Sequence, residues 1–158
     1  MSDLSERSEF VADASVYRLT AIAYWESAKV LQKAIEDKGE KVPGNRAAIP
    51  YYLLISHAIE LFLKCALLKR GVSPEALKKY EFRHDLKTLL EAIEAFKVAI
   101  TARTREVVMV ISPQHKDHVL RYSVFRWDSG PVYVPEPAEI DAVLEELLMI
   151  GRISTHGV

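Results

Sequence analysis

The sequence holds a single cysteine, Cys65, among its 158 residues. One cysteine cannot form an intramolecular disulfide, and it excludes zinc or iron–sulfur sites built from several cysteines. Its scarcity also favours a reducing compartment. The polar, acidic start lacks the features of a signal peptide, and no run of about 18 uncharged apolar residues occurs. We therefore expect a cytoplasmic protein that is neither exported nor membrane-spanning.

A surplus of either charge is also lacking. The 21 basic and 22 acidic residues leave a net charge of −1, so no overall field favours nucleic acid or an anionic membrane as the partner. No internal repeat appears, which excludes solenoids. The length suits one domain, and a hydrophobic content of 49 % suffices for one core. We predict a single domain over residues 1–158, with its core at about 8–150.

Several catalytic motifs are missing. The chain has no glycine-rich phosphate loop, no G-x-G-x-x-G and no G-x-S-x-G. These absences exclude the common nucleotide hydrolases, Rossmann dehydrogenases and α/β-hydrolases.

Apolar residues recur at spacings of three and four over most of the chain, which predicts amphipathic helices. The predicted helices are 8–38, 50–70, a short one at 73–80, 84–100, a short turn from Ser112-Pro113 and a last one from Pro137. β-Branched and aromatic residues predict a hairpin-like or extended arm at about 123–136, and residues 151–158 are expected to fray. The predicted fold is all-α, an antiparallel bundle of four to five helices with one irregular arm.

The segment 50–70 has few polar residues and is predicted to be the central, most buried helix, with Cys65 as an inert small hydrophobe. His57, Glu60 and Lys64 lie at i, i+3 and i+7, so they project from one side of it. Glu60 precedes Lys64 by four residues, the favourable orientation for an ion pair. The pair is either a buried contact that fixes the helix register or part of a polar groove that accepts a ligand.

Arg83, His84 and Asp85 stand where the next helix is predicted to begin. Asp85 there would cap free backbone N–H groups. Capping does not explain Arg83 and His84, and a histidine beside an arginine suits acid–base chemistry on a phosphodiester.

Metal ligation is not expected. His57 and Glu60 have a spacing used in di-iron bundles, but those bundles need a second such pair, which this chain lacks. His115 and His118 are also three apart, in a polar turn where solvated histidines are expected. We predict no metal and no cofactor.

Three stretches in this order resemble the HEPN-domain family: Tyr51 to Leu67, His84 to Leu90, and Arg121-Tyr122. The resemblance covers about residues 10–150. It implies a bundle of four or five helices that forms a homodimer. It further implies a role in prokaryotic defence or a toxin–antitoxin system, with a nucleotidyltransferase or an antitoxin as the partner.

Many members of that family are metal-independent RNases that carry Arg-x(4–6)-His, and no such spacing occurs in this chain. We therefore favour a non-catalytic HEPN-like module that homodimerises and binds a nucleotide, RNA or partner protein. Its predicted ligand-binding residues are His57, Glu60, Lys64, Asp85, Arg121 and Tyr122. The alternative is an atypical metal-independent RNase, with His84 as the acid–base and Arg83 or Arg121 stabilising the developing charge.

Local charge supports a binding role. Residues 64–87 contain seven basic and three acidic side chains, whereas residues 131–158 contain five acidic ones and one basic. The opposed stretches suit binding of RNA or a nucleotide, pairing with an acidic partner or with another copy of the chain, or they are simply solvated helix faces. Arg121-Tyr122 and Arg126-Trp127 could stack on bases, or their aromatic rings could pin the arm to the bundle.

Overall fold

The computed structural model describes residues 3–117 and 134–153. The predicted all-α fold is confirmed, because the described part of the chain consists of helices and connections without a strand. The elements are α1 (Asp3–Glu36), α2 (Ala48–Leu68), α3 (Pro74–Leu77), the 3₁₀ helix η1 (Tyr80–Phe82), α4 (Leu86–Ala95), α5 (Ala102–Lys116) and α7 (Pro137–Arg152).

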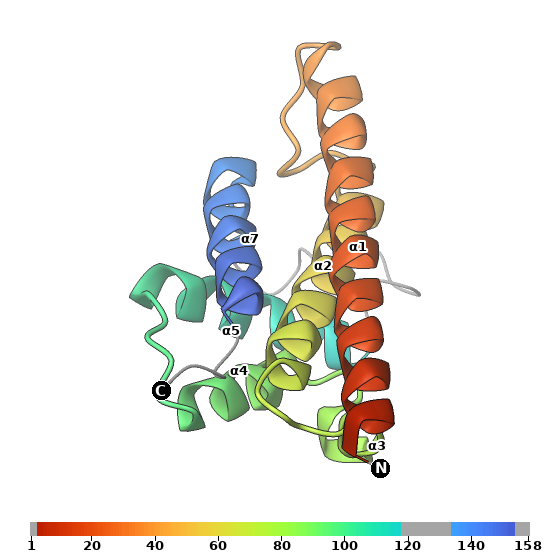
Figure 1. The fold of residues 1–158 in the computed structure, drawn as a ribbon. Helices are drawn as coiled ribbons and strands as arrows, with labels where there is room; N and C mark the ends of the chain where they lie inside the picture. Colours follow the sequence, from red (N-terminus) through yellow and green to blue (C-terminus); the bar gives the residue numbers. More distant parts are fainter. Residues whose placement is uncertain (1–2, 118–133, 154–158) are drawn as a thin grey trace.

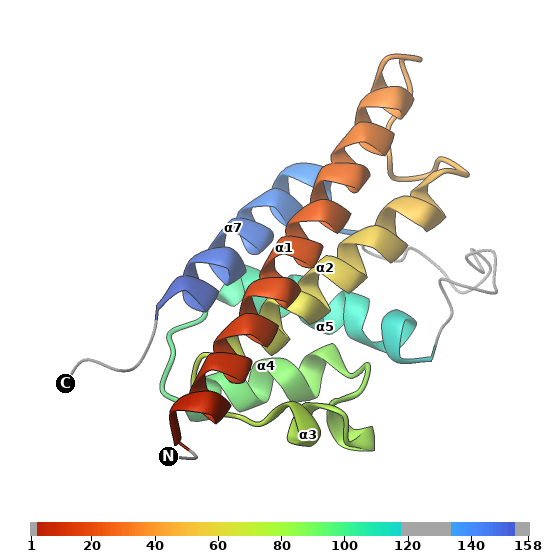
Figure 2. The ribbon, with the colours of Figure 1, turned by 45° about the vertical axis from the view of Figure 1, so that its right-hand side comes forward.

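The long helix α1 runs along the outside of the molecule, and α2 returns beside it in the opposite direction (Figure 1). α7 runs in the same direction as α2 and packs against it (Figure 2). α4 and α5 lie across the bundle, and α2 packs against α1, α4, α5 and α7. The segment predicted to be the central helix is therefore the one that contacts most of the others.

The buried hydrophobic side chains form one core cluster around α2. Phe62 and Leu63 are at most 1 % exposed, and Cys65 is buried as predicted. The indole of Trp25 on α1 packs edge-on against Phe62 and donates to Asp141 on α7 over 2.7 Å. This contact joins α1, α2 and α7 at one level of the bundle.

Local sequence explains most helix ends. α2 ends at Leu68, and Gly71 follows with a φ of +87°, the left-handed conformation that glycine adopts without strain. The Val72 N–H donates to the Leu67 carbonyl and closes the turn. The Ser73 hydroxyl accepts from the Ala76 N–H, with Pro74 in the first turn of α3.

The later helices begin with equally clear caps. The Asp85 side chain accepts from the Thr88 N–H at the start of α4, as predicted, and Thr101 accepts from Thr104 at the start of α5. Glu136 opens α7 with a reciprocal capping box.

The prediction of a helix over 84–100 was wrong at its end, because α4 stops at Ala95. Lys97 has a φ of +62°, a left-handed residue that ends the helix. Val98 and Ile100 still pack against the core, whereas Phe96 is 43 % exposed. The apolar spacing therefore continued past Ala95 while the backbone had already left the helix.

The short turn predicted from Ser112-Pro113 was also wrong, because both residues lie inside the longer helix α5. Pro113 is tolerated near its end, where only one backbone hydrogen bond is lost. Val107, Val108 and Ile111 are buried on one face, so the three-and-four spacing was present but weak.

Two smaller boundaries differ. The helix predicted at 73–80 is the single turn α3 followed by η1, and α7 extends through Gly151 and Arg152, which were expected to fray. A Cβ added at Gly151 would lie 3.5 Å from Sγ of buried Cys65, in ordinary van der Waals contact. Residues 154–158 and most of the predicted arm at 123–136 lie outside the described residues.

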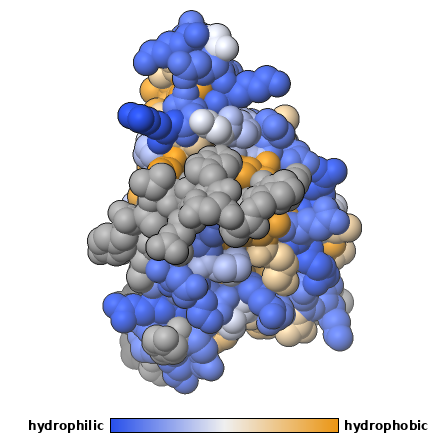
Figure 3. All heavy atoms as spheres, turned by 180° about the vertical axis from the view of Figure 1, so that it is seen from behind, coloured by the Kyte–Doolittle hydropathy of each residue, from blue (hydrophilic) through white to orange (hydrophobic). Residues whose placement is uncertain are grey.

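Seen from behind, the surface is mainly hydrophilic at both ends, with apolar residues visible between them (Figure 3). By length and composition alone α2 could cross a membrane, but 78 % of its apolar window is buried inside the bundle. Core helices of soluble proteins share this property, so the prediction of no membrane contact stays a prediction.

Candidate functional site

A buried carboxylate on α2 is the centre of the polar residues predicted to matter. Glu60 is 5 % exposed, and its Oε1 accepts from the Lys64 ammonium over 2.5 Å, one helical turn away. The Lys64 ammonium also donates to the backbone carbonyl of Arg83 over 3.2 Å. The predicted pair on one side of the helix is present, and Lys64 links it to the segment before α4.

Two histidines from other elements face the second oxygen of the same carboxylate. His115 Nε2 lies 2.5 Å and His84 Nδ1 lies 3.3 Å from Glu60 Oε2. His115 comes from α5 and is 4 % exposed, whereas His84 precedes α4 and its side chain is 31 % exposed. Glu60, Lys64, His84 and His115 therefore form one contiguous group, which we call the Glu60 cluster.

The Glu60 cluster keeps its carboxylate ionised. Burial alone would raise the pKa of the Glu60 carboxyl group. Hydrogen bonds from His115 and Lys64, together with their charges, outweigh burial and lower that pKa from the ordinary 4.5 to about 2. Glu60 is therefore an anion at any physiological pH.

His57 belongs to the edge of this cluster. Its Nδ1 lies 2.8 Å from the Leu53 carbonyl, which fixes the ring and makes Nδ1 the hydrogen-bond donor. The ring stacks on Tyr24 at 5.4 Å and meets His115 edge-on at 5.0 Å between centroids. His57 thus packs against His115 and holds its ring in place.

Asp85 contacts α5. Besides capping α4, its carboxylate binds the Lys116 ammonium over 2.8 Å and accepts from the Ser112 hydroxyl over 3.3 Å. Burial raises the pKa of Asp85, but the bonds from Lys116 and Thr88 outweigh it and lower that pKa. These bonds make Asp85 a support that fixes α4 against α5, next to His84.

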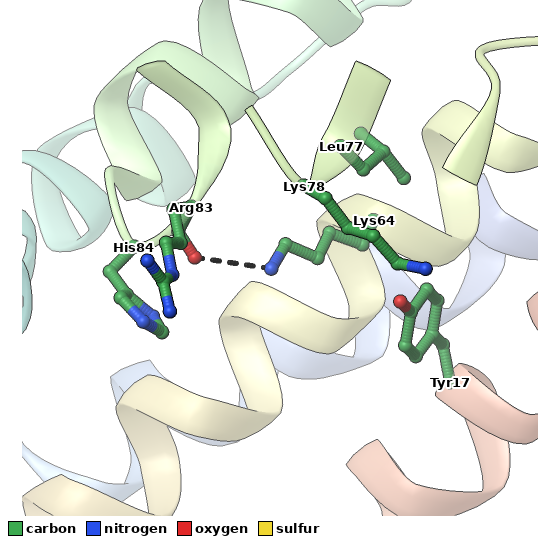
Figure 4. Close-up of a pocket in the computed structure, with 6 residues that line it drawn as sticks. All are labelled: Tyr17, Lys64, Leu77, Lys78, Arg83 and His84. Carbon is green, nitrogen blue, oxygen red and sulfur yellow. Dashed lines mark hydrogen bonds between the residues drawn. The ribbon is translucent and has the colours of Figure 1, made fainter. Parts of the chain in front are cut away.

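A pocket opens beside the Glu60 cluster, with a volume of about 550 Å³. It is lined by Tyr17, Lys64, Leu77, Lys78, Arg83 and His84. Figure 4 shows the Arg83 and His84 side chains lying next to each other at one end, while Lys78 and Tyr17 lie at the other. Lys64 and His84 belong to both the cluster and the pocket, so the buried carboxylate lies directly behind the pocket wall.

The sequence alternatives of a buried ion pair and an open groove are both partly realised. Glu60 is sealed in the core, as the ion-pair reading required, whereas His84 and Arg83 line an open pocket. The predicted site residues Arg121 and Tyr122, and the pair Arg126-Trp127, lie outside the described residues.

The expectation that His115 is solvated in a polar turn was wrong. His115 lies in the last turn of α5 and is buried against Glu60. The burial of His115 follows from the spacing only if the helix begins at Ala102, because His115 then lies on the same buried face as Val108 and Ile111. His118 lies outside the described residues.

One set of side chains has the composition of a metal site. Glu60, His84 and His115 each offer one ligand atom, and these atoms lie within 4.8 Å of one another. Two imidazoles and a carboxylate are ligands of zinc and of non-haem iron in proteins. The chain can therefore place three ligands at one point without further rearrangement of its helices.

Comparisons of the chain with protein-family models, with curated protein sequences and with solved structures find no match. What the chain does has to be inferred from its own side chains and from the motif resemblance in its sequence.

Proposed function

We propose that this chain is a non-catalytic HEPN-like module that binds the phosphate groups of a nucleotide or of RNA. The observation that carries the proposal is the pocket of Figure 4, whose polar lining is cationic or imidazole apart from the Tyr17 hydroxyl. No carboxylate is among its lining residues in the described part of the chain. Such a lining attracts anions, and among the described residues it holds no carboxylate that would repel phosphate oxygens.

The charges of the pocket are not all neutralised by neighbours. Lys64 offsets Glu60, but no ion pair from Lys78 or Arg83 to any described residue is present. Two cations at opposite sides of one cavity, with no ion pair inside the described ranges 3–117 and 134–153, suit a phosphodiester or a diphosphate. Arg83 adds a planar fork of donors that matches two phosphate oxygens, which a lysine cannot do.

The size and the apolar part of the lining fit the rest of such a ligand. A volume of about 550 Å³ lies inside the usual range for small-molecule pockets, roughly 300–1,000 Å³. Tyr17 offers an aromatic face for a base, and Leu77 offers an apolar contact.

Binding is tested by fluorescence anisotropy with a labelled single-stranded RNA oligonucleotide and by calorimetry with ATP. Arg83→Ala and Lys78→Ala should each weaken binding roughly 10-fold or more, since a charge-assisted hydrogen bond contributes about 1.5–3 kcal/mol. The salt dependence of RNA binding should fall by about one unit of slope for each variant. Comparison of the two probes separates a mononucleotide ligand from RNA.

Lys33→Ala is the matched control. Lys33→Ala removes one positive charge, as Arg83→Ala and Lys78→Ala do, and the Lys33 side chain is 75 % exposed. Lys33 lies 16 residues along α1 from Tyr17, roughly 24 Å away from the pocket. Equal losses in Lys33→Ala and Arg83→Ala would show that binding is diffuse and would refute the pocket. Absence of binding to either probe would refute the proposal as a whole.

We further propose that the module acts as a homodimer, in a defence or toxin–antitoxin setting with a nucleotidyltransferase or antitoxin as second partner. The dimer is supported by exposed apolar side chains on α1, where Val16, Leu19 and Val30 are 58 %, 61 % and 72 % exposed. Light scattering of the purified chain tests it, and a strictly monomeric mass at high micromolar concentration would contradict it.

A second candidate function is a metal-independent RNase. It is favoured by the position of His84, which faces the pocket beside Arg83 while its Nδ1 lies 3.3 Å from the buried Glu60 carboxylate. A carboxylate behind a histidine orients its ring. His84 would then take the proton of a ribose 2′-hydroxyl as that oxygen attacks phosphorus, and Arg83 would stabilise the added negative charge. The bond from phosphorus to the 5′-oxygen would break, the leaving 5′-oxygen would take a proton from water, and a 2′,3′-cyclic phosphate would remain.

The two candidates differ in one experiment. Labelled RNA is incubated with the protein in EDTA, and the products are followed on a denaturing gel. Cleavage that persists in EDTA and is lost in His84→Ala would establish the RNase and refute the non-catalytic module. Uncleaved RNA that is nevertheless bound through Arg83 would refute the RNase.

A further inference from the structure

Three potential ligands from three parts of the chain converge at the inner wall of the pocket. They come from α2 (Glu60), from the residue pair before α4 (His84) and from the end of α5 (His115). We propose that Glu60, His84 and His115 form a binding site for a divalent cation of the zinc type, with three protein ligands. This inference does not depend on the proposed function.

Both imidazoles address the same carboxylate oxygen. His84 Nδ1 and His115 Nε2 lie near Glu60 Oε2, while Lys64 occupies Oε1. The carboxylate has a charged partner in Lys64 already, so two further ring nitrogens are more than its neutralisation requires. Nitrogens that converge on one oxygen are placed so that a cation can replace the protons between them.

The distances fit after small adjustments. Ligand atoms around tetrahedral zinc, with bonds of about 2.0–2.2 Å, lie about 3.4 Å apart. The separation of 3.3 Å between Glu60 and His84 matches this value. The contact of 2.5 Å between Glu60 and His115 would lengthen by about 1 Å, which rotation of one side chain provides.

Surrounding residues hold the three ligands in place. Glu60 is buried in the packed helix α2, with its Oε2 facing both histidine rings. His115 is fixed by the edge-on contact with His57, and His57 is itself held by Leu53 and Tyr24. Preorganised ligands lose little freedom when a metal binds, which favours binding.

The site also has an entrance and an open position. Glu60 and His115 are buried, but His84 lines the pocket with 31 % of its side chain exposed. A cation can therefore reach the ligands from the pocket, and water from the pocket can supply the fourth ligand. Three protein ligands with one open position are typical of reactive rather than purely structural zinc sites.

Ligand type selects the cation. Two imidazoles and one carboxylate suit zinc, cobalt and ferrous iron, whereas magnesium and calcium prefer sites made only of oxygen ligands. Zn²⁺ is therefore the probe of choice, Co²⁺ is its spectroscopic substitute, and Mg²⁺ is the negative control.

The test begins with protein freed of metal by EDTA and dialysis. Calorimetric titration with Zn²⁺ should give one ion per chain, and Co²⁺ should give the visible absorption of a tetrahedral site. His84→Ala removes a ligand that is not in the core, and it should weaken binding by more than the roughly 10–100-fold that loss of an outer-shell partner usually costs. Mg²⁺ should produce no heat at the same concentration.

A second variant excludes two of the three other histidines. His118→Ala combined with His156→Ala removes imidazoles outside the proposed site, and Zn²⁺ binding should be unchanged. Circular dichroism confirms that each variant keeps its helices. Nitrogen chemical shifts of the imidazoles should report zinc at Nδ1 of His84 and at Nε2 of His115.

The proposal is overturned if no Zn²⁺ binds at micromolar protein. It is equally overturned if His84→Ala binds Zn²⁺ as well as the wild type, or if the His118 and His156 double variant loses binding. A wild-type protein that binds Zn²⁺ but binds neither RNA nor ATP would instead refute the proposed function and leave the metal site standing.

Discussion

Replacement of the buried carboxylate is the sharpest test of how the Glu60 cluster stabilises the fold. Glu60→Gln keeps the size of the side chain and removes its charge. The Lys64 ammonium and the His115 ring then face a neutral amide inside the core, where their hydrogen bonds are weaker. We expect the protein to fold and to be markedly less stable in metal-free buffer.

The pKa of Glu60 sets the magnitude. A shift from 4.5 in the unfolded chain to about 2 in the fold corresponds to about 3 kcal/mol, at 1.36 kcal/mol for each unit. This value agrees with the roughly 3–5 kcal/mol lost when one partner of a buried ion pair is removed. The free energy of unfolding should therefore fall by about 3 kcal/mol at pH 7.

The same shift fixes the pH dependence. Because the folded-state pKa is lowered, the stabilisation is complete above the unfolded-state pKa of 4.5 and is lost as the pH falls towards about 2. The difference between wild type and Glu60→Gln should shrink to about 1–1.5 kcal/mol at pH 3.

Urea unfolding in EDTA, followed by circular dichroism at several pH values between 3 and 7, measures this difference. Glu91→Gln is the matched control, since Glu91 forms an i, i+4 pair with Lys87 on the surface, where both side chains are more than half exposed. It should change stability by less than about 0.5 kcal/mol. A loss below about 1 kcal/mol for Glu60→Gln at pH 7, or a loss that is the same at pH 3, would refute the reasoning.

Three further substitutions test the scaffold, each by urea unfolding. Asp85→Ala removes the cap of α4 and the contact with Lys116, and it should cost about 1–2 kcal/mol; no loss would mean that the cap is dispensable. Leu63→Ala empties a fully buried position of α2 and should cost about 2–5 kcal/mol, and a smaller loss would indicate that the core collapses around it. Gly71→Ala should cost about 1 kcal/mol because alanine is strained at a φ of +87°, whereas a gain in stability would contradict this argument.

Strong local signals made most of the fold predictable. The α2 segment combines an apolar composition with a glycine at its end, and Asp85 stands at a helix start, so propensity and tertiary structure agree. α5 was missed because Ser112-Pro113 has the sequence of a helix start, and only packing shows that the helix continues through it. The end of α4 was missed because Val98 and Ile100 contact the core from outside a helix.

The candidate site was predictable on one helix and not between helices. The spacing of Glu60 and Lys64 is local, so their pairing follows from helix geometry. The contact between Glu60 and His115 joins residues 55 positions apart, and no periodicity encodes it. Arg121, which was predicted as a ligand-binding residue, lies outside the described residues and stays a prediction, whereas His115 was not predicted and joins the Glu60 cluster.

A substitution of Lys64 can distinguish phosphate binding from metal binding, because the charge of Lys64 should favour the first and disfavour the second. Its ammonium lines the pocket and would attract phosphate, yet it also binds Glu60 Oε1 and would repel a cation at Oε2. Lys64→Met keeps much of the apolar stem, and it should weaken binding of RNA or ATP while Zn²⁺ binding is kept or strengthened. Calorimetry with both ligands on the same variant measures the two effects. A variant that loses Zn²⁺ together with phosphate, while its helices stay intact, would show that zinc binding requires Lys64 and would contradict this assignment of its charge.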